Sequence, residues 1–259
     1  MFQKLVACGV FAGLAAGLIA AALQIFFVVP ILLEAERYES GELIHFAGGA
    51  EVGADSAAHD RGAHDHGSGA SAETGQAAQG QSGSDHGEDG SNLLRHVLTV
   101  LATVAAFCGF GLLLTAGFAL AERRGYQPDG RAGLLWGVGG FVAVQLAPAA
   151  GLPPELPGST VGDLVLRQAW WFSTVLLTGT GIWFIAFAKH WVPWTLGAIL
   201  VFVPHLFAAP HPNVFGGVAP PELASAFAAR SLAVGFASWV ILGLITGYVW
   251  QKNPFGDDT

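Results

Sequence analysis

The stretch LVACGVFAGLAAGLIAAALQIFFVV, Leu5–Val29, decides the fold class because it carries no charged side chain. Gln24 is its only polar side chain. A helix of about 20 apolar residues spans a bilayer, and this run is longer than the ~7–15 residues of a cleaved signal peptide's apolar region. We therefore predict a retained transmembrane helix at the N-terminus.

Further apolar runs follow the first along the rest of the chain. The other expected spans are Val97–Ala121, Leu134–Ala150, Ala169–Ala188, Thr195–Ala209 and Leu232–Trp250. Thr195–Ala209 is the weakest, because it is short and is interrupted by Pro204 and His205. The prediction is an all-α integral membrane protein with a bundle of six transmembrane helices, and a bundle of five is the alternative.

Composition supports the membrane and disfavours other classes of protein. Of the 259 residues, 53% are hydrophobic and 12% are charged, about half the charged share of a soluble domain. This argues against a soluble enzyme, a nucleic-acid binder and a disulfide-rich module. Cys8 and Cys108 lie inside apolar runs. We find no phosphate-binding loop, zinc-protease motif or nucleophile elbow, so we do not expect an enzyme.

Charged and aromatic residues near the span ends bear on orientation. Six tryptophans fall at or near expected ends, as in an interfacial aromatic belt: Trp136, Trp170, Trp171, Trp191, Trp194 and Trp250. The strongest basic cluster is Arg123, Arg124 and Arg131, in the short loop after the second span. Because basic short loops stay in the cytoplasm, we expect a cytoplasmic N-terminus.

Residues 47–92 differ in kind from the rest of the chain. They are mostly Gly, Ala, Ser, Gln, Asp, Glu and His, with almost no large apolar side chain. Such a composition buries too little surface to offset its ordering entropy. We expect one membrane domain over 1–259, with 47–92 as a disordered, His-rich extramembrane loop. The charged stretch Glu34–Glu39 should continue the first helix past Pro30.

A faint internal repeat suggests three helical hairpins of one design. Pro-Pro-Glu-Leu occurs at 153–156 and at 220–223, each time before an even-numbered span. Arg95, Arg167 and Arg230 each precede an even-numbered span. An arginine at a helix N-terminus opposes the helix dipole, so we expect compensation by glutamates of the repeated loops. Chance in a Pro- and Gly-rich chain is the alternative.

Histidines suggest metal capture. Five of the nine lie between positions 45 and 86, namely His45, His59, His64, His66 and His86. Neutral imidazole binds Co, Ni, Cu and Zn ions, and the interleaved carboxylates add oxygen ligands. A flexible loop of this kind would collect ions loosely and without strong selectivity. A solvated linker in which histidine is incidental is the alternative.

Polar residues at membrane depth form a second set of candidates. His205 follows Pro204, which frees a backbone carbonyl, and His211 lies six residues later in a proline-rich segment. Ionisable groups inside a membrane are functional candidates. A core histidine bonded to a carbonyl is an equal alternative for His205. For Gln24 and Gln145 we favour structural roles.

Several of these stretches resemble the CbtA-type family of proposed cobalt transporter subunits. The resemblance lies in the first helix running into Val28–Glu36, Pro153–Gly158, Arg167–Phe172, Thr178–Ile182, Pro204–Pro210 and Pro221–Ala224. The His-rich insert also looks like the family. The resemblance implies a bacterial inner-membrane protein linked to cobalt uptake for cobalamin synthesis. It further implies a small single-span, His-bearing partner of the CbtB type.

Two hypotheses follow. In the first, the chain is a transport subunit whose loop captures a divalent metal, cobalt before nickel or zinc. His205 and His211 would be a second metal station, and the helical bundle would pass the ion across. In the second, it is a non-transporting membrane sensor or metal buffer. A polar path through the bundle favours transport, and a sealed bundle favours the sensor.

Overall fold

Helices are the only extended regular elements among the residues that the computed structural model describes, which are 2–44 and 88–252, without the side chains of 88–93. They are α1 (Phe2–Phe27), α2 (Val29–Glu39), α3 (Glu88–Glu122), α4 (Gly130–Phe141), the π-helical segment η2 (Val142–Leu146), α5 (Ala147–Ala149), α6 (Leu164–Phe187), α7 (Trp191–Leu206) and α8 (Pro221–Lys252). The first nine residues of α3 belong to a separate structural unit, residues 46–96. The helix contacts described here are those within the other unit, residues 1–45 and 97–259. As expected, a helix continues past Pro30, as α2.

Five helices of the described residues are long and apolar enough to cross a membrane. They are Phe2–Phe27, Leu94–Glu122, Gly130–Ala149, Leu164–Phe187 and Pro221–Lys252. The sixth expected span is the shorter apolar helix α7, of 16 residues. By length and composition, therefore, the five-span alternative holds.

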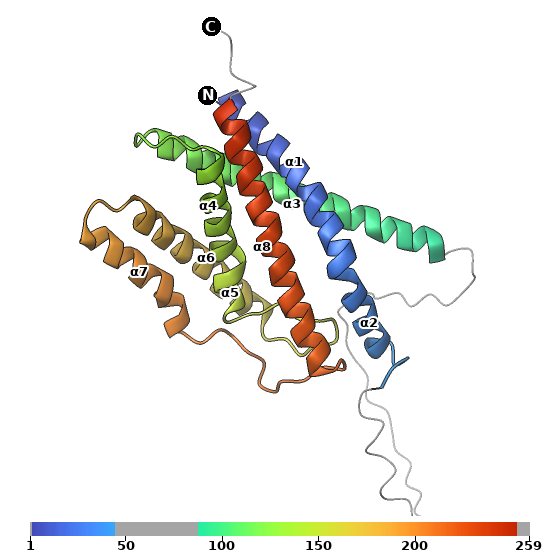
Figure 1. The fold of residues 1–259 in the computed structure, drawn as a ribbon. Helices are drawn as coiled ribbons and strands as arrows, with labels where there is room; N and C mark the ends of the chain where they lie inside the picture. Colours follow the sequence, from blue (N-terminus) through green and yellow to red (C-terminus); the bar gives the residue numbers. More distant parts are fainter. Residues whose placement is uncertain (1, 45–87, 253–259) are drawn as a thin grey trace, which may run out of the picture. The chain divides into compact units, whose positions relative to one another are not determined.

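Contacts next to α7 nevertheless show that the helix runs from one end of the bundle to the other. Just before α7, the ring of Phe187 lies 4.7 Å from that of Tyr126, between α3 and α4. After α7, the Thr160 hydroxyl bonds the Gly216 carbonyl at 3.0 Å, in the loops before α6 and α8. In Figure 1 α7 accordingly runs antiparallel to α6. Six elements thus alternate in direction, although α7 is short.

The start of α1 and the end of α8 meet at one end of the bundle, which we call the terminal end. The Lys4 ammonium lies 4.3 Å from the centre of the Trp250 ring. The Trp250 indole N–H donates to Glu122 at 2.6 Å, which brings in the end of α3. Trp250 is buried among other helices, so it is not the exposed interfacial residue that the sequence predicted. Trp191 and Trp194 are exposed.

Glycines allow α1 and α3 to cross closely. A Cβ atom added to Gly13 would lie 2.7 Å from the Cys108 nitrogen, and one added to Gly111 would strike the Gly9 carbonyl oxygen. The Gly9, Gly13 and Gly17 series therefore forms a helix contact, as small residues at four-residue spacing do in membranes. A second small stripe of α1, which includes Ala12, Ala16 and Ala20, is fully buried in the core shared with α8.

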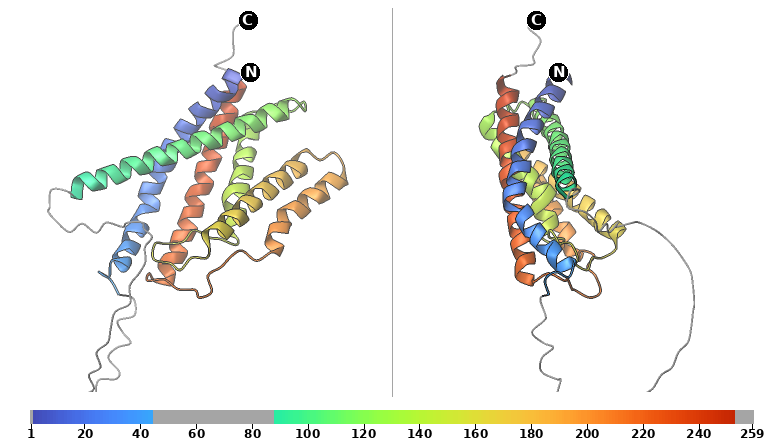
Figure 2. Two further views of the ribbon diagram at one scale, coloured as in Figure 1. Left: turned by 180° about the vertical axis from the view of Figure 1, so that it is seen from behind. Right: turned by 90° about the vertical axis from the view of Figure 1, so that its right-hand side faces the viewer.

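Two other helix pairs repeat this arrangement. In the pair of α4 and α8, a Cβ atom on Gly243 would lie 2.7 Å from Gly137 and would strike the Gly133 carbonyl. In the pair of α6 and α7, a Cβ atom on Gly181 would lie 2.6 Å from the Gly197 carbonyl. Figure 2 shows α8 between α1 and α4, and it packs extensively against both.

The pair of α1 and α3 matches the first expected hairpin, whereas the other two close pairs differ from the expected hairpins. Sequential pairing would place α7 against α8, but the two helices make no contact with each other. The physical reason is the position of the glycines. The glycines of α8 match those of α4, and the one glycine of α7, Gly197, matches Gly181 of α6. The third expected hairpin is therefore not a packed pair.

The direction of α7 predicts which loops share a side of the membrane. In a chain carrying Cys8→Ala and Cys108→Ala, we would introduce single cysteines at the exposed positions Gln127, His190 and Asn213. An impermeant thiol reagent should modify the first two from one side and the third from the other. Labelling of positions 190 and 213 from the same side would show that α7 does not cross.

Candidate functional site: a polar seam inside the bundle

The third transmembrane element contains a widened turn. Between α4 and α5 the chain forms η2, in which the Ala147 N–H bonds the Val142 carbonyl five residues back. Pro148 has no N–H to give to the Val144 carbonyl, which would be its partner in a regular helix. Pro148 is fully buried. Such π-helical turns occur frequently at functional sites, which directs attention to the side chains around η2.

Gln145 lies in this widened turn and faces α8. Its side-chain oxygen Oε1 is buried without a hydrogen-bond partner. The amide rests against Gly235, where an added Cβ atom would collide with Oε1. Glycine at 235 therefore makes the room that the Gln145 amide occupies. We expected a structural role for Gln145, yet no hydrogen bond within the described protein satisfies its oxygen.

All five buried, unpartnered side-chain polar atoms of the described residues lie on η2 and on the two long helices, α6 and α8, that contact it. They are Gln145 Oε1, Trp170 Nε1, Thr178 Oγ1, Ser231 Oγ and Trp239 Nε1. We call these five residues the polar seam. Ser231, Gly235 and Trp239 follow one another at four-residue spacing, so they share one face of α8.

The seam has a defined chemistry. It offers one amide oxygen, two hydroxyls that donate and accept, and two indole N–H groups that only donate. A buried polar group without a partner costs several kcal/mol in an apolar medium, and no solvent in a bilayer core lowers that cost. A mixed set of donors and acceptors suits water, or the water shell of a hydrated ion, better than a bare cation.

Gln24, the other glutamine at membrane depth, has a structural role. The Thr103 hydroxyl donates to its Oε1 at 3.1 Å and links α1 to α3. Hydrogen bonds of this kind hold transmembrane helices together.

His205 lies at the end of α7, exposed rather than enclosed in a packed core. The centre of its ring is 6.1 Å from that of Trp170, a seam residue, and the two rings meet edge to face. Trp170 is also close to the loop after α5, since a Cβ atom on Gly151 would lie 2.6 Å from its ring. His205 thus marks the end of the seam away from the terminal end.

Of the remaining predicted metal residues, the structure describes His211 alone. His211 is exposed in the loop after α7, with its ring centre 5.6 Å from that of Phe215. His45, His59, His64, His66 and His86 lie outside the described residues. Within 2–44 and 94–252, where side chains are described, no three His, Cys, Asp or Glu side chains are grouped to hold a metal ion.

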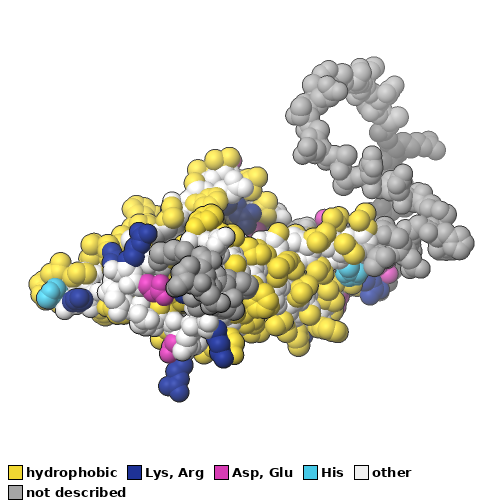
Figure 3. All heavy atoms as spheres, turned by 90° about the horizontal axis from the view of Figure 1, so that it is seen from above, with side chains coloured by type: hydrophobic (Ala, Val, Ile, Leu, Met, Phe, Trp, Pro, Cys, Tyr) yellow, Lys and Arg dark blue, Asp and Glu magenta, His cyan; other side chains and the backbone are white. Residues whose placement is uncertain are grey.

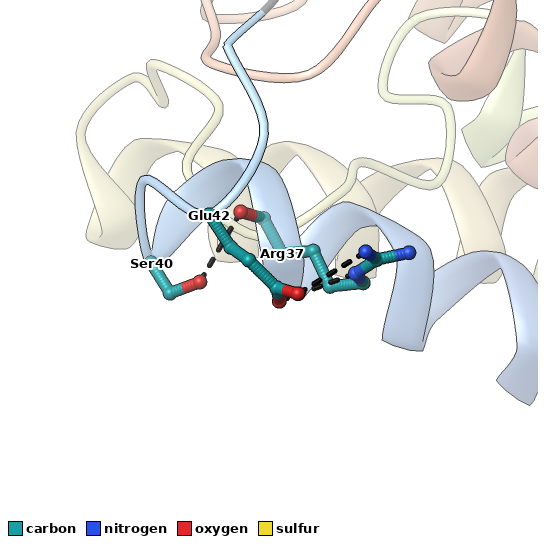
Figure 4. A network of polar contacts seen from close by, with 3 residues as sticks. All are labelled: Arg37, Ser40 and Glu42. Carbon is teal, nitrogen blue, oxygen red and sulfur yellow. Dashed lines mark hydrogen bonds and ion pairs between the residues drawn. The ribbon is translucent and has the colours of Figure 1, made fainter.

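The expected compensation of arginine by glutamate is formed at Arg167. Arg167, in the first turn of α6, donates to Glu155 at 2.6 Å. Arg230 was expected to stand just before its helix, and this is wrong. Helix α8 begins at Pro221, so Arg230 lies well inside it, away from the N-terminal turn. Arg37 after α1 instead pairs with Glu42 at 3.1 Å (Figure 4), and this bond lowers the pKa of the Glu42 carboxyl.

Sequence inspection missed four of the five seam residues. Trp170 was noted as an interfacial tryptophan and Thr178 as part of the stretch Thr178–Ile182, neither as a buried polar group. No pattern set Ser231 or Trp239 apart. The usable indications were Gln145 inside an apolar run and Pro148 three residues later, which together mark an interrupted helix with a polar side chain.

The two membrane glutamines should respond in opposite ways to Leu. Gln24→Leu should lower the unfolding free energy in mixed micelles by about 0.5–1 kcal/mol, because it breaks the bond to Thr103. Gln145→Leu should leave that free energy unchanged or raise it, because it removes a buried atom without a partner. An equal loss in both variants would show that Gln145 is bonded in the folded protein.

Comparison with known proteins gives one match, which covers nearly the whole chain. The model of the family described as "Probable cobalt transporter subunit (CbtA)" matches residues 2–251. No curated protein and no solved structure matches the chain. The match extends from the first helix to the end of α8, and so includes every element that contributes to the seam. The chain is therefore a multi-pass membrane protein of the CbtA family of probable cobalt transporter subunits.

Proposed function

We propose that the chain is the membrane subunit of an uptake transporter for cobalt, and that the ion crosses the bundle along the polar seam. The observation that carries the proposal is the seam itself. Five buried polar atoms without partners lie on η2, α6 and α8, in a bundle whose core is otherwise mostly apolar. A purely structural helix bundle gains nothing from this arrangement, which costs stability. Family membership supplies cobalt as the cargo, with nickel and zinc as alternatives.

Charge at the two ends of the bundle supports a cytoplasmic N-terminus. Among the described residues, the terminal end carries six basic side chains and two carboxylates: Lys4, Arg123, Arg124, Arg131, Lys189 and Lys252 with Glu122 and Asp129. Figure 3 looks onto this end and shows dark blue Lys and Arg side chains among apolar surface. Because basic loops remain in the cytoplasm, the terminal end would face inward, and the His-rich segment would be periplasmic in a bacterial inner membrane.

The opposite end is acidic, which suits the entry of cations. Its described residues include seven carboxylates and three arginines: Glu34, Glu36, Glu39, Glu42, Glu155, Asp163 and Glu222 with Arg37, Arg167 and Arg230. Carboxylates gathered on one face raise the local concentration of cations. Loose capture by His45, His59, His64, His66 and His86 would add to this effect. The ion would then reach His205 and His211 at the outer end of the seam.

A second subunit would complete the metal station. Cobalt bound by imidazoles needs more ligands than His205 and His211 supply, and the described residues group no third ligand with them. A single-span, His-bearing subunit of the CbtB type could contribute the missing imidazole. This part of the proposal is supported by the family resemblance and by the incomplete ligand set.

A membrane sensor or metal buffer is the alternative function. Such a protein needs only the His-rich segment to bind metal, and its helices could be sealed. The seam and the exposed position of His205 beside it favour transport. The two functions differ in one observable, which is net movement of cobalt across the membrane.

Cobalt accumulation in cells tests the proposal. At limiting external cobalt, cells that express the chain with its partner should accumulate more radioactive cobalt than cells lacking the chain. His205→Gln should lower this uptake about tenfold or more, because amides bind divalent transition metals poorly. His190→Gln is the matched control at the terminal end and should transport like the parent.

Two outcomes of this measurement would contradict the proposal. Equal accumulation with and without the chain would remove the transport function and favour the sensor. Parent-like uptake by a normally expressed His205→Gln variant would leave transport in place and remove His205 from the path.

A further inference from the structure

Two adjoining cavities open at the terminal end, away from the polar residues at the opposite end. The first has a volume of about 420 Å³, and Arg124, Tyr126, Trp183 and Lys189 line it. The second has about 390 Å³ and runs along α3, α4 and α6. Tyr126, Trp183 and Phe187 line both. The two cavities therefore form one groove with a basic mouth, formed by Arg124 and Lys189, and an apolar body.

The basic mouth has charge that no described lining residue neutralises. Of the described residues that line either cavity, none carries a carboxylate. The two acidic side chains that the structure describes at this end are engaged elsewhere. Glu122 accepts the Trp250 indole N–H at 2.6 Å, and Asp129 caps α4 by accepting the Ala132 N–H at 2.7 Å. Arg124 stacks over Trp183, 5.0 Å from its ring centre, which fixes the guanidinium at the mouth.

The apolar body of the groove opens toward the outside of the bundle. Two of its lining residues, Leu113 of α3 and Leu135 of α4, are more than half exposed. Its floor includes Ala143 and Val144 of η2 together with Trp239. In a bilayer this opening faces hydrocarbon, so a lipid chain can enter sideways while its headgroup stays at the mouth.

We propose that this groove binds one anionic phospholipid, with its phosphate at Arg124 and Lys189 and an acyl chain along α3, α4 and α6. Guanidinium and ammonium groups bind phosphate through charge-assisted hydrogen bonds, and basic pockets between transmembrane helices on the cytoplasmic side bind anionic headgroups. Tyr126 and Trp183 lie at the depth where amphipathic rings meet headgroups.

The size and position of the groove favour a lipid over other occupants. A helix with its side chains is about 10–12 Å across, so this volume would hold only about one turn of a partner helix. A free phosphate would use the mouth alone and leave the apolar body empty. A bound acyl chain would pack against η2 and Trp239. It would thereby separate the polar seam from the hydrocarbon of the bilayer. Lipid binding itself does not depend on which ion is transported.

Native mass spectrometry of the full chain with phosphatidylglycerol and phosphatidylcholine tests the proposal. The parent should retain phosphatidylglycerol in preference to phosphatidylcholine. The double variant Arg124→Gln, Lys189→Gln should lose about tenfold or more of this binding. The matched control Arg123→Gln, Arg131→Gln removes the same charge from exposed positions of the same end and should bind like the parent. Thermal unfolding checks that both variants are folded.

A third variant separates a lipid from a free anion. Gly179 lines the apolar body, and an added Cβ atom would meet only the Ala143 Cβ, at 3.9 Å, so Gly179→Leu fills the groove and keeps the charges. It should lose phosphatidylglycerol binding as well. The proposal is overturned if the lipid binds equally to both double variants or if phosphatidylcholine binds as well as phosphatidylglycerol. It is also overturned if Gly179→Leu retains the lipid and inorganic phosphate displaces it.

Discussion

The close approach of backbone to backbone at glycine is the interaction on which the rest of this bundle depends. In a bilayer, apolar side chains gain nothing by leaving lipid for one another, so helices associate through packing at small residues. Here the Gly133 carbonyl of α4 lies where a side chain on Gly243 would be, and α1 and α3 repeat this contact at Gly9 and Gly111. These contacts choose which helices are neighbours and override the order of the chain. For that reason α8 packs against α1 and α4 rather than α7.

The polar seam lies where α8 no longer meets the backbone of α4 directly. Along α8, the glycines that meet α4 directly give way to Gly235, which makes room for the Gln145 amide instead. Pro148 forces the widened turn of η2 and sets the position of that amide. Tight contacts toward the terminal end thus hold α4 and α8 in register, and the polar groups lie beyond them. Helices α3, α4 and α6 form the lipid groove, and Ala143 and Val144 of η2 also line it.

Apolar runs were sufficient to locate every helix that crosses the bundle, because hydrocarbon requires them and nothing else in the sequence resembles them. The helix ends could not be found in this way. Helix α8 begins at Pro221 and not near Leu232. Its first turns, before the apolar run, are partly exposed helix, which hydropathy does not detect. Whether five or six spans are counted depends on α7, which is shorter than the other spans. Only the contacts at its two ends show that it runs along the bundle.

The site was harder to predict than the fold. Glycines at four-residue spacing in α1 allow close packing, but spacing alone does not identify their partners on α3. Gln24 and Gln145 look alike in sequence, and the difference between them is a Thr103 hydroxyl on another helix. The seam is therefore a property of helix pairing. The histidine interpretation stays a prediction, since five of its seven residues lie outside the described part of the chain.

The most direct measurement of the central claim is the water accessibility of position 145 inside the membrane. In a background of Cys8→Ala and Cys108→Ala, Gln145→Cys would be compared with Leu146→Cys, whose neighbouring position is exposed on the outside of the bundle. A small, positively charged thiol reagent, followed by mass spectrometry, should modify the thiol at 145 and spare the one at 146, and added cobalt should slow the reaction. Equal inertness of both thiols in a folded protein would contradict a polar path at η2.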